Sequence, residues 1–207
     1  MALVAAAGDP PPSSAIEQAV AALAAGQVLA LPTDTVYGLA VDPFSIGATD
    51  RLFRVKRRPR EVDLPVLVAA AEQVADLATA VPASARRLME RFWPGALTVV
   101  LPRRPGLRAD LGTDEATVGV RCPAHPVPLA LCRAQGPIAA TSANLHGEPT
   151  ITTAAEVCAV FGDSVAVVLD GGTCTGAPST VVDCTGAEPK LLREGRLPWA
   201  DVLAAAG

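Results

Sequence analysis

A hydroxyl-rich turn and a dense group of cations lie within one short stretch of this sequence. An apolar run leads into Pro32-Thr33-Asp34-Thr35 and Tyr37, and about one short helix later the chain reads Lys56-Arg57-Arg58-Pro59. Hydroxyl groups suit a small polar substrate, whereas a lysine and a planar guanidinium suit different oxygens of a phosphate. The spacing therefore predicts a site that holds a small polar substrate beside a polyphosphate.

The cations taken alone leave a second interpretation open. Six of the 17 basic residues lie between positions 51 and 60, where a helix is predicted to end. Positive charge near a helix C-terminus is favoured by the helix dipole, so a solvated helix end is the simpler interpretation. Phosphate binding is the alternative, and Pro59 favours it, because proline stops the helix and holds Lys56 and Arg58 near the next strand.

Three further segments carry groups that could bind a ligand. The turn Thr141-Ser142-Ala143-Asn144 follows an apolar strand, and its small hydroxyl and amide groups allow close approach. Arg121 and Arg193 each end a strand, where a guanidinium needs an acidic partner or a ligand carboxylate. The glycine-rich segment 170–178 could gather backbone N–H groups around an anion, and it is our candidate for a lid. Ordinary turns and strand-end ion pairs explain each segment equally well, so none identifies a function alone.

Composition excludes several classes of function. A net charge of −4 argues against a general polyanion binder. The two histidines, His125 and His146, lack the spacing to Cys or Glu of a metal site, and no carboxylate pair suggests acid–base hydrolysis. Five widely spaced cysteines indicate free thiols in a reducing, cytoplasmic compartment. The chain has no apolar stretch long enough to span a membrane and no signal-like N-terminus, so we expect no membrane partner.

Periodicity and turn residues predict the elements that position these groups. We expect a loose or edge N-terminal segment over residues 1–13 and one domain over residues 14–207, whose first helix has a capping box at Ser14-x-x-Glu17. Helices are predicted at 14–25, 48–56, 72–78, 84–92, 129–134, 153–161 and 200–205, and strands at 28–31, 66–69, 97–101, 117–121, 138–141, 165–169, 180–183 and 191–193. The order favours a single α/β domain with a twisted, mixed β-sheet flanked by helices.

Seven blocks of the sequence together resemble the YrdC/TsaC family of L-threonylcarbamoyl-AMP synthases. In chain order they are PTDTVYGLA (32–40), KRRP (56–59), FWPGALTVVL (92–101), TVGVRCPAHP (117–126), IAATSANLHG (138–147), STVVDCTG (179–186) and LLREG (191–195). They extend over about residues 15–195. A single block is moderately specific, whereas all seven in family order are highly specific. The resemblance implies a short, single-domain form with a YrdC-like catalytic domain over residues 14–207.

The resemblance also implies a reaction. L-Threonine and bicarbonate give N-carboxy-threonine, whose carbamate attacks the α-phosphorus of ATP and releases pyrophosphate. The resulting threonylcarbamoyl-adenylate serves the modification of the adenosine next to the anticodon of certain tRNAs. The implied partners are therefore L-threonine, bicarbonate, ATP, Mg²⁺ carried by the ATP phosphates, tRNA and the downstream threonylcarbamoyl transferase complex, with no metal ligand from the protein.

Two other functions remain as alternatives at this stage. One is a non-catalytic YrdC-like module that binds double-stranded RNA or tRNA, for which the basic residues at 51–60 provide phosphate contacts. The other is a carbamoyl-transfer enzyme that uses carbamoyl-phosphate. The short chain and the absence of clustered cysteines that could bind zinc speak against this second alternative.

Residue roles carry over from the family by position. The matching residues are Lys56 and Arg58 as the catalytic pair that holds the ATP phosphates, Thr35, Arg121, Ser142 and Ser179 as contacts of L-threonine, and Thr117, Asn144, Thr152 and Arg193 as contacts of the nucleotide. Arg121 is the one expected to pair with the threonine carboxylate, which a guanidinium can bind with two N–H groups.

Three departures from the family pattern concern mainly the threonine side of the expected pocket. Many members carry a histidine at the end of the strand that here reads Pro65-Val66-Leu67-Val68-Ala69, and the spacing after Arg58 is one residue longer. His146 stands where a second serine is usual, and Pro178 stands where an acidic residue often precedes Ser179.

Overall fold

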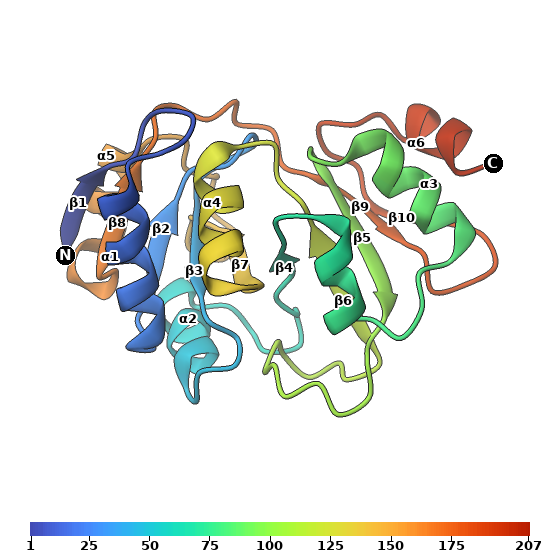
Figure 1. Cartoon of the computed structure of the whole chain (residues 1–207), viewed down its shortest axis with the longest axis horizontal. Coiled ribbons are helices and arrows are strands. Elements are labelled where there is room, and N and C mark those ends of the chain that lie inside the picture. Colours follow the sequence, from blue (N-terminus) through green and yellow to red (C-terminus); the bar gives the residue numbers. More distant parts are fainter.

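One sheet of ten strands runs along the length of the molecule in the computed structural model, which describes residues 1–207 (Figure 1). The strands are β1 (Ala2–Ala5), β2 (Leu29–Leu31), β3 (Gly38–Val41), β4 (Val66–Leu67), β5 (Leu97–Pro102), β6 (Thr117–Arg121), β7 (Ile138–Ser142), β8 (Val167–Asp170), β9 (Thr180–Asp183) and β10 (Lys190–Arg193). Their order in the sheet is β1-β8-β2-β3-β7-β4-β6-β5-β9-β10, with both parallel and antiparallel pairs. The predicted α/β fold with a mixed sheet is confirmed.

Helices cover both faces of this sheet. They are α1 (Ser13–Ala24), α2 (Ala48–Lys56), α3 (Ala83–Phe92), α4 (Pro126–Gln135), α5 (Ala154–Phe161) and α6 (Trp199–Ala206), with 3₁₀ turns at Ala71–Asp76 and Gly162–Ser164. Helices α1 and α4 pack together over the smaller buried apolar cluster, and α2, α3, α5 and α6 contribute to the larger one. None of these helices is long and apolar enough to cross a lipid bilayer.

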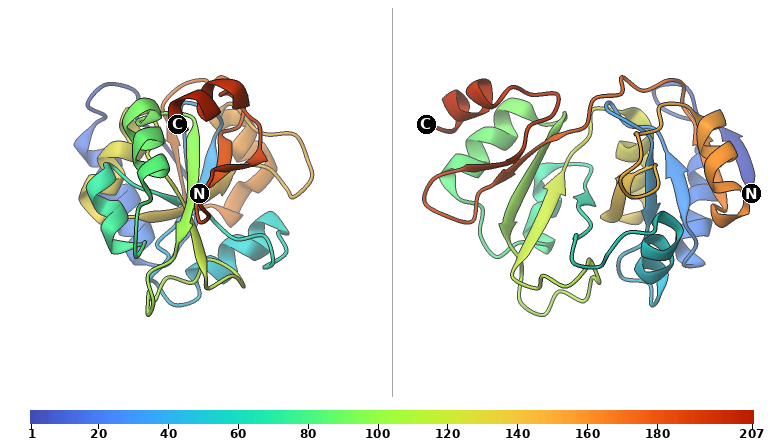
Figure 2. Two further views of the ribbon diagram at one scale, coloured as in Figure 1. Left: turned by 90° about the vertical axis from the view of Figure 1, so that its right-hand side faces the viewer. Right: turned by 180° about the vertical axis from the view of Figure 1, so that it is seen from behind.

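The two termini lie at opposite ends of the sheet. Strand β1 forms one edge, and α6 packs against α3 near the other edge (Figures 1 and 2). The chain crosses from one half to the other in residues 171–179, because this segment connects β8, the second strand of the sheet, with β9, the ninth. Segments that are distant in sequence therefore meet in the middle of the sheet.

The structure differs from the sequence predictions mainly at the N-terminal half. Residues 2–5, predicted to belong to a loose or edge segment, form the edge strand β1 parallel to β8. Helix α1 has Pro12 at its N-cap and no side-chain cap, so the capping box predicted at Ser14 and Glu17 is wrong. The second predicted capping box is confirmed, since Thr153 and Glu156 make both of its hydrogen bonds. Strand β3 was not predicted, because Gly-Leu-Ala-Val follows the preceding turn without a break in composition.

Candidate functional site

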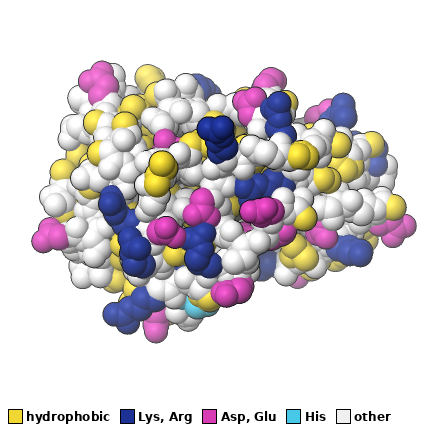
Figure 3. Space-filling model, turned by 90° about the horizontal axis from the view of Figure 1, so that it is seen from below, with side chains coloured by type: hydrophobic (Ala, Val, Ile, Leu, Met, Phe, Trp, Pro, Cys, Tyr) yellow, Lys and Arg dark blue, Asp and Glu magenta, His cyan; other side chains and the backbone are white.

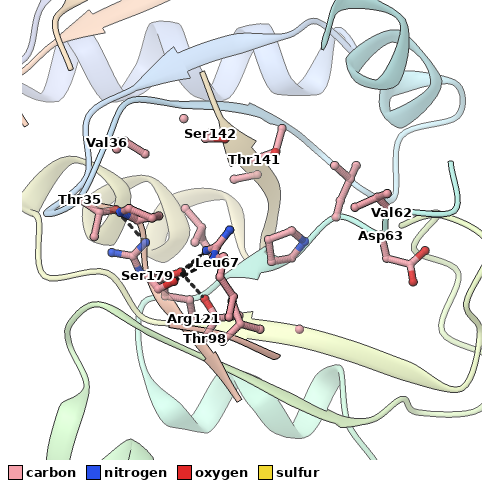
Figure 4. A pocket seen from close by; sticks show the side chains of 18 of the residues that line it. Thr35, Val36, Val62, Asp63, Leu67, Thr98, Arg121, Thr141, Ser142 and Ser179 are labelled. Carbon is pink, nitrogen blue, oxygen red and sulfur yellow. Dashed lines mark hydrogen bonds between the residues drawn. The ribbon is translucent and has the colours of Figure 1, made fainter. Parts of the chain in front are cut away.

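A cavity of about 600 Å³ lies on one face of the sheet, over β7, β4, β6, β5 and β9. Side chains paired in register across a sheet point to the same face. Leu67 of β4 pairs with Arg121 of β6, and the register of β5 places Thr98 beside Arg121. Leu67, Arg121 and Thr98 therefore form one row of side chains across the cavity wall, and Ser142 lies on the same face of β7, further along that strand (Figure 4).

Arg121 is the buried cation in the middle of this row. Its Nη2 pairs with Asp34 at 2.7 Å, its Nη1 donates to the Thr35 hydroxyl at 3.0 Å, and its Nε donates to the Gly95 carbonyl at 3.0 Å. Burial lowers the pKa of Arg121, and the Asp34 carboxylate opposes that effect. Three of the five N–H groups are used in this way, so two remain for a carboxylate ligand.

The hydroxyl-rich turn holds the groups around this guanidinium. The Thr33 hydroxyl accepts hydrogen bonds from the backbone N–H groups of Thr35 and Val36, at 3.1 and 3.2 Å, and donates to the Val36 carbonyl. Such a side-chain bond closes the turn locally. It places the Thr35 hydroxyl 2.8 Å from the Thr33 hydroxyl and beside Arg121. The turn residues therefore form a fixed polar wall.

A second hydroxyl pair completes this end of the cavity. The hydroxyls of Thr98 and Ser179 lie 2.9 Å apart, and both residues are buried. Ser179 also contacts Arg193. The Arg193 guanidinium donates to the Ser179 carbonyl at 2.8 Å and to the Ser179 hydroxyl at 3.2 Å. The hydroxyl pair thus connects the end of the cavity near Arg121 with Arg193. Arg193 is exposed, and we call its end of the cavity the mouth.

Arg58 is the second guanidinium of the mouth. Arg57 ends α2 in a left-handed conformation with a φ of 54°, and this turn directs Arg58 into the cavity wall. Arg58 donates to the Val62 carbonyl at 2.6 Å and to the Asp63 carbonyl at 3.0 Å. Burial and the charge of Arg193 both lower the pKa of Arg58, as expected of two cations that share one cavity. The pair offers free N–H groups to a polyanion.

Lys56 occupies a different environment, although it stands only two residues before Arg58. It is fully buried, and its Nζ lies 2.6 Å from the Ser142 carbonyl, 2.9 Å from the Asn144 carbonyl and 2.8 Å from Asn144 Oδ1. Burial and the nearby Arg58 lower the pKa of Lys56 to about 7. The three N–H groups are all used by the turn, so Lys56 holds Ser142 and Asn144 from behind rather than lining the cavity.

The segment 170–178 is fastened along its length. Tyr37 donates from its hydroxyl to the Gly172 carbonyl at 2.9 Å, and burial, followed by the charge of Asp170, raises the pKa of Tyr37. The backbone N–H of Gly176 donates to the Thr35 carbonyl at 2.8 Å, and the Thr175 hydroxyl donates to the Asp34 carbonyl at 3.0 Å. These bonds tie the expected lid to the hydroxyl-rich turn.

Most of the residues predicted from the resemblance meet in this cavity. Its lining includes Thr35, Arg58, Thr117, Arg121, Ser142, Asn144, Ser179 and Arg193. Lys56 lies behind the wall, and Thr152 lies outside it, where its backbone N–H and hydroxyl contact Glu156. The roles assigned to all ten residues remain predictions.

Sequence reasoning missed three residues of the site. Asp34 was interpreted only as part of a hydroxyl-rich turn, yet it pairs with a residue 87 positions away, and no local pattern reports such a contact. Thr98 could have been noticed as the one polar residue in an otherwise apolar strand, Leu97–Pro102. Leu67 lines the cavity as an apolar residue at a strand end and carries no sequence signal of that role.

Comparisons with known proteins place these observations in a wider context. Residues 21–195 match the Sua5/YciO/YrdC family model, described as telomere recombination. The threonylcarbamoyl-AMP synthase of Bacillus subtilis is 42% identical over 93% of this chain and 56% of its own length, and that of Klebsiella pneumoniae is 40% identical over 89% of this chain and 97% of its own length.

Solved structures give the same result for the fold. Pyrococcus abyssi Sua5 complexed with L-threonine matches with a TM-score of 0.90 at 35% identity, covering 100% of this chain and 61% of that chain. Escherichia coli YciO matches with a TM-score of 0.87 at 27% identity, covering 98% of each chain. The chain thus spans less than two thirds of the longer relatives and nearly all of the shorter ones.

Proposed function

This chain belongs to the Sua5/YciO/YrdC family, and from that membership we propose that it is a threonylcarbamoyl-AMP synthase, a nucleotidyltransferase that condenses L-threonine, bicarbonate and ATP. One structural observation supports the proposal independently of the names of its relatives. A single cavity joins a buried guanidinium with two unused N–H groups, at Arg121, to a pair of guanidinium groups at the mouth, Arg58 and Arg193. The buried guanidinium suits the carboxylate of an amino acid, and the pair at the mouth suits a polyphosphate. The proposed reaction requires both ligands in one cavity.

The end near Arg121 is suited to the amino acid. The two free N–H groups of Arg121 bind the threonine carboxylate, while Asp34 fixes the orientation of the guanidinium from the other side. The hydroxyls of Thr35 and Ser179 are within the same lining and bind polar atoms of the substrate. The solved complex of Pyrococcus abyssi Sua5 with L-threonine supports an amino-acid site in this fold.

The mouth is suited to ATP. Arg58 and Arg193 offset the charge on the phosphates, and Thr117 and Asn144 lie further along the same lining. The carbamate oxygen of N-carboxy-threonine forms a bond to the α-phosphorus as the bond to the pyrophosphate oxygen breaks. The attacking carbamate is already an anion, so the step needs no general base. Catalysis then consists of positioning and charge stabilisation.

Mg²⁺ fits this account as a companion of the nucleotide. The structure contains no group of three or more His, Cys, Asp or Glu residues that could hold a metal ion. Mg²⁺ commonly keeps several waters and binds through substrate phosphates, so we assign its ligands to ATP and water. Its chemistry when bound would be neutralisation of phosphate charge beside Arg58.

We further propose that the product serves the threonylcarbamoyladenosine modification of tRNA in the cytoplasm, through a downstream transferase complex. A second candidate function, a module that binds tRNA without catalysis, is favoured by one observation. Arg51, Arg54 and Arg57 are exposed at three-residue spacing along α2. Figure 3, which views the molecule from below, shows that acidic side chains are interspersed among the basic ones, which weakens a purely electrostatic site.

Pyrophosphate release from ATP tests the proposed enzyme. The assay contains Mg²⁺, and threonine and bicarbonate are left out in turn. A synthase releases pyrophosphate only when both are present. Tight tRNA binding that weakens steeply with salt, without such release, would favour the binding module instead.

A further inference from the structure

Leu67 borders the polar side chains at the inner end of the cavity. It ends β4, where it pairs in register with Arg121 on one side and with Ile138 on the other. Neighbouring strands lie about 4.8 Å apart, so the Leu67 side chain stands one strand spacing from Arg121 on the same face. Leu67 is 6% exposed and lines the cavity, and Figure 4 shows it among the side chains that surround the cavity.

The residue on the other side of Arg121 is polar rather than apolar. Strand β5 lies on the other side of β6 and carries Thr98, whose hydroxyl is bonded to that of Ser179. A carboxylate bound to Arg121 is therefore flanked by an isobutyl group on one side and by hydroxyl groups on the other. Ala140 extends the apolar side, since it lies on the same face of β7 and lines the same cavity.

Threonine matches this asymmetry at its β-carbon, which carries one methyl and one hydroxyl group. We propose that Leu67 is the residue that selects threonine over serine, by packing against the β-methyl of the substrate. This inference rests on the proposed function, which brings the amino acid to Arg121. Serine lacks the methyl and leaves a void against Leu67, and one methyl in an apolar pocket is worth roughly 10–200-fold in kcat/KM.

The two sides of the site are expected to discriminate against different amino acids. The apolar side formed by Leu67 and Ala140 discriminates against serine. The hydroxyl pair of Thr98 and Ser179 discriminates against valine, which has the shape of threonine but would leave these hydroxyls facing a methyl group. Substitution of Leu67 is therefore expected to change the threonine-to-serine ratio and to leave the rejection of valine in place.

The test measures kcat/KM for threonine, serine and valine by pyrophosphate release, at saturating ATP and bicarbonate. Wild type should prefer threonine to serine by at least roughly 10-fold. Leu67→Ala should reduce that preference to within roughly 3-fold, by lowering kcat/KM for threonine while that for serine stays constant. Leu67→Val removes less of the side chain and should shift the ratio in the same direction, so it replaces Leu67→Ala if the latter does not fold.

Leu192→Ala is the matched control, because Leu192 lines the same cavity at its mouth and is 59% exposed. It should raise KM for ATP and leave the threonine-to-serine ratio unchanged. Equal ratios in wild type, Leu67→Ala and Leu67→Val would overturn the inference while leaving the synthase itself intact. Wild type that turns over no amino acid at all would instead contradict the proposed function.

Discussion

The two ends of the cavity differ in the partners that their guanidinium groups bond within the protein. At the inner end, Arg121, Asp34 and Thr35 are bonded to one another, and their side chains are largely buried. At the mouth, Arg58 and Arg193 bond mainly to backbone carbonyls, and the rim residue Leu192 is exposed. The inner end is therefore preformed for its ligand, whereas the mouth is completed by the ligand that binds there.

The same contrast appears between Lys56 and Arg58, which the sequence presents as one phosphate-binding pair. The buried face of α2 includes Leu52, Phe53 and Lys56, so the ammonium of Lys56 points into the protein. The left-handed Arg57 then ends the helix, and Arg58 reaches the cavity. Lys56 therefore stabilises the wall, whereas Arg58 lines the cavity.

The largest expected effect comes from breaking the buried ion pair of the inner end. Arg121→Met leaves the largely buried Asp34 carboxylate without its cation and with only the backbone N–H of Ala124 as a donor, which should lower the free energy of unfolding by about 3–5 kcal/mol. It should also lower kcat/KM for threonine by about 1000-fold, because the carboxylate anchor is lost. Denaturant unfolding and pyrophosphate release measure the two effects.

The double variant Asp34→Asn, Arg121→Met separates stability from binding. It removes the uncompensated charge, so most of the lost stability should return while activity stays low. An Arg121→Met protein as stable as wild type would contradict a preformed ion pair.

Removal of the Lys56 charge should have the next largest effect. Lys56→Met removes a buried donor that three oxygens of Ser142 and Asn144 share, which should destabilise the protein by about 2–3 kcal/mol. Thermal and urea unfolding measure this change. Stability equal to that of wild type would mean that the ammonium does not hold the turn.

Arg58→Met is the matched variant at the mouth and should behave in the opposite way. Its bonds are to carbonyls of a loop near the surface, so the free energy of unfolding should change by less than about 1 kcal/mol. KM for ATP should rise about 10- to 100-fold, while binding of threonine alone is retained. Steady-state kinetics with varied ATP measure the effect, and a large loss of stability would remove the contrast with Lys56.

The last expected effect concerns pH. The pKa of Lys56 is lowered from 10.5 to about 7 in the folded state, so between these values the unfolded chain binds the additional proton. The contribution of Lys56 to stability is therefore fully present above pH 10.5 and is lost as pH falls through 7. The difference in unfolding free energy between wild type and Lys56→Met should rise from pH 7 to 9.5, by less than about 1.4 kcal/mol per pH unit. A flat difference in urea unfolding would contradict a lowered pKa.

The sequence predicted best the elements whose ends are marked by residues within or next to them. The bounds of α2, β6 and β9 agree with the sequence prediction, because apolar periodicity and flanking turn residues define each of them. Strand β1 consists of four small apolar residues whose only partner is β8, more than 160 positions away. Its pairing depends on the assembled sheet, so the sequence could predict only a loose or edge segment there.

The candidate site shows the same division. Its charged and hydroxyl residues could be chosen by chemistry and by resemblance, and most of them line one cavity. The position of Leu67 beside Arg121 could not be predicted, since it depends on the strand order β7-β4-β6-β5. Cross-strand register is a property of the whole sheet, and no single segment encodes it.

Calorimetric titration of threonine into the enzyme without nucleotide tests the preformed inner end most directly. The account predicts that threonine binds, that a non-hydrolysable ATP analogue changes its Kd by less than about 3-fold, and that Arg58→Met binds as wild type does. The folded double variant Asp34→Asn, Arg121→Met should give no binding heat. Threonine binding that requires nucleotide, or that persists in the double variant, would contradict the account.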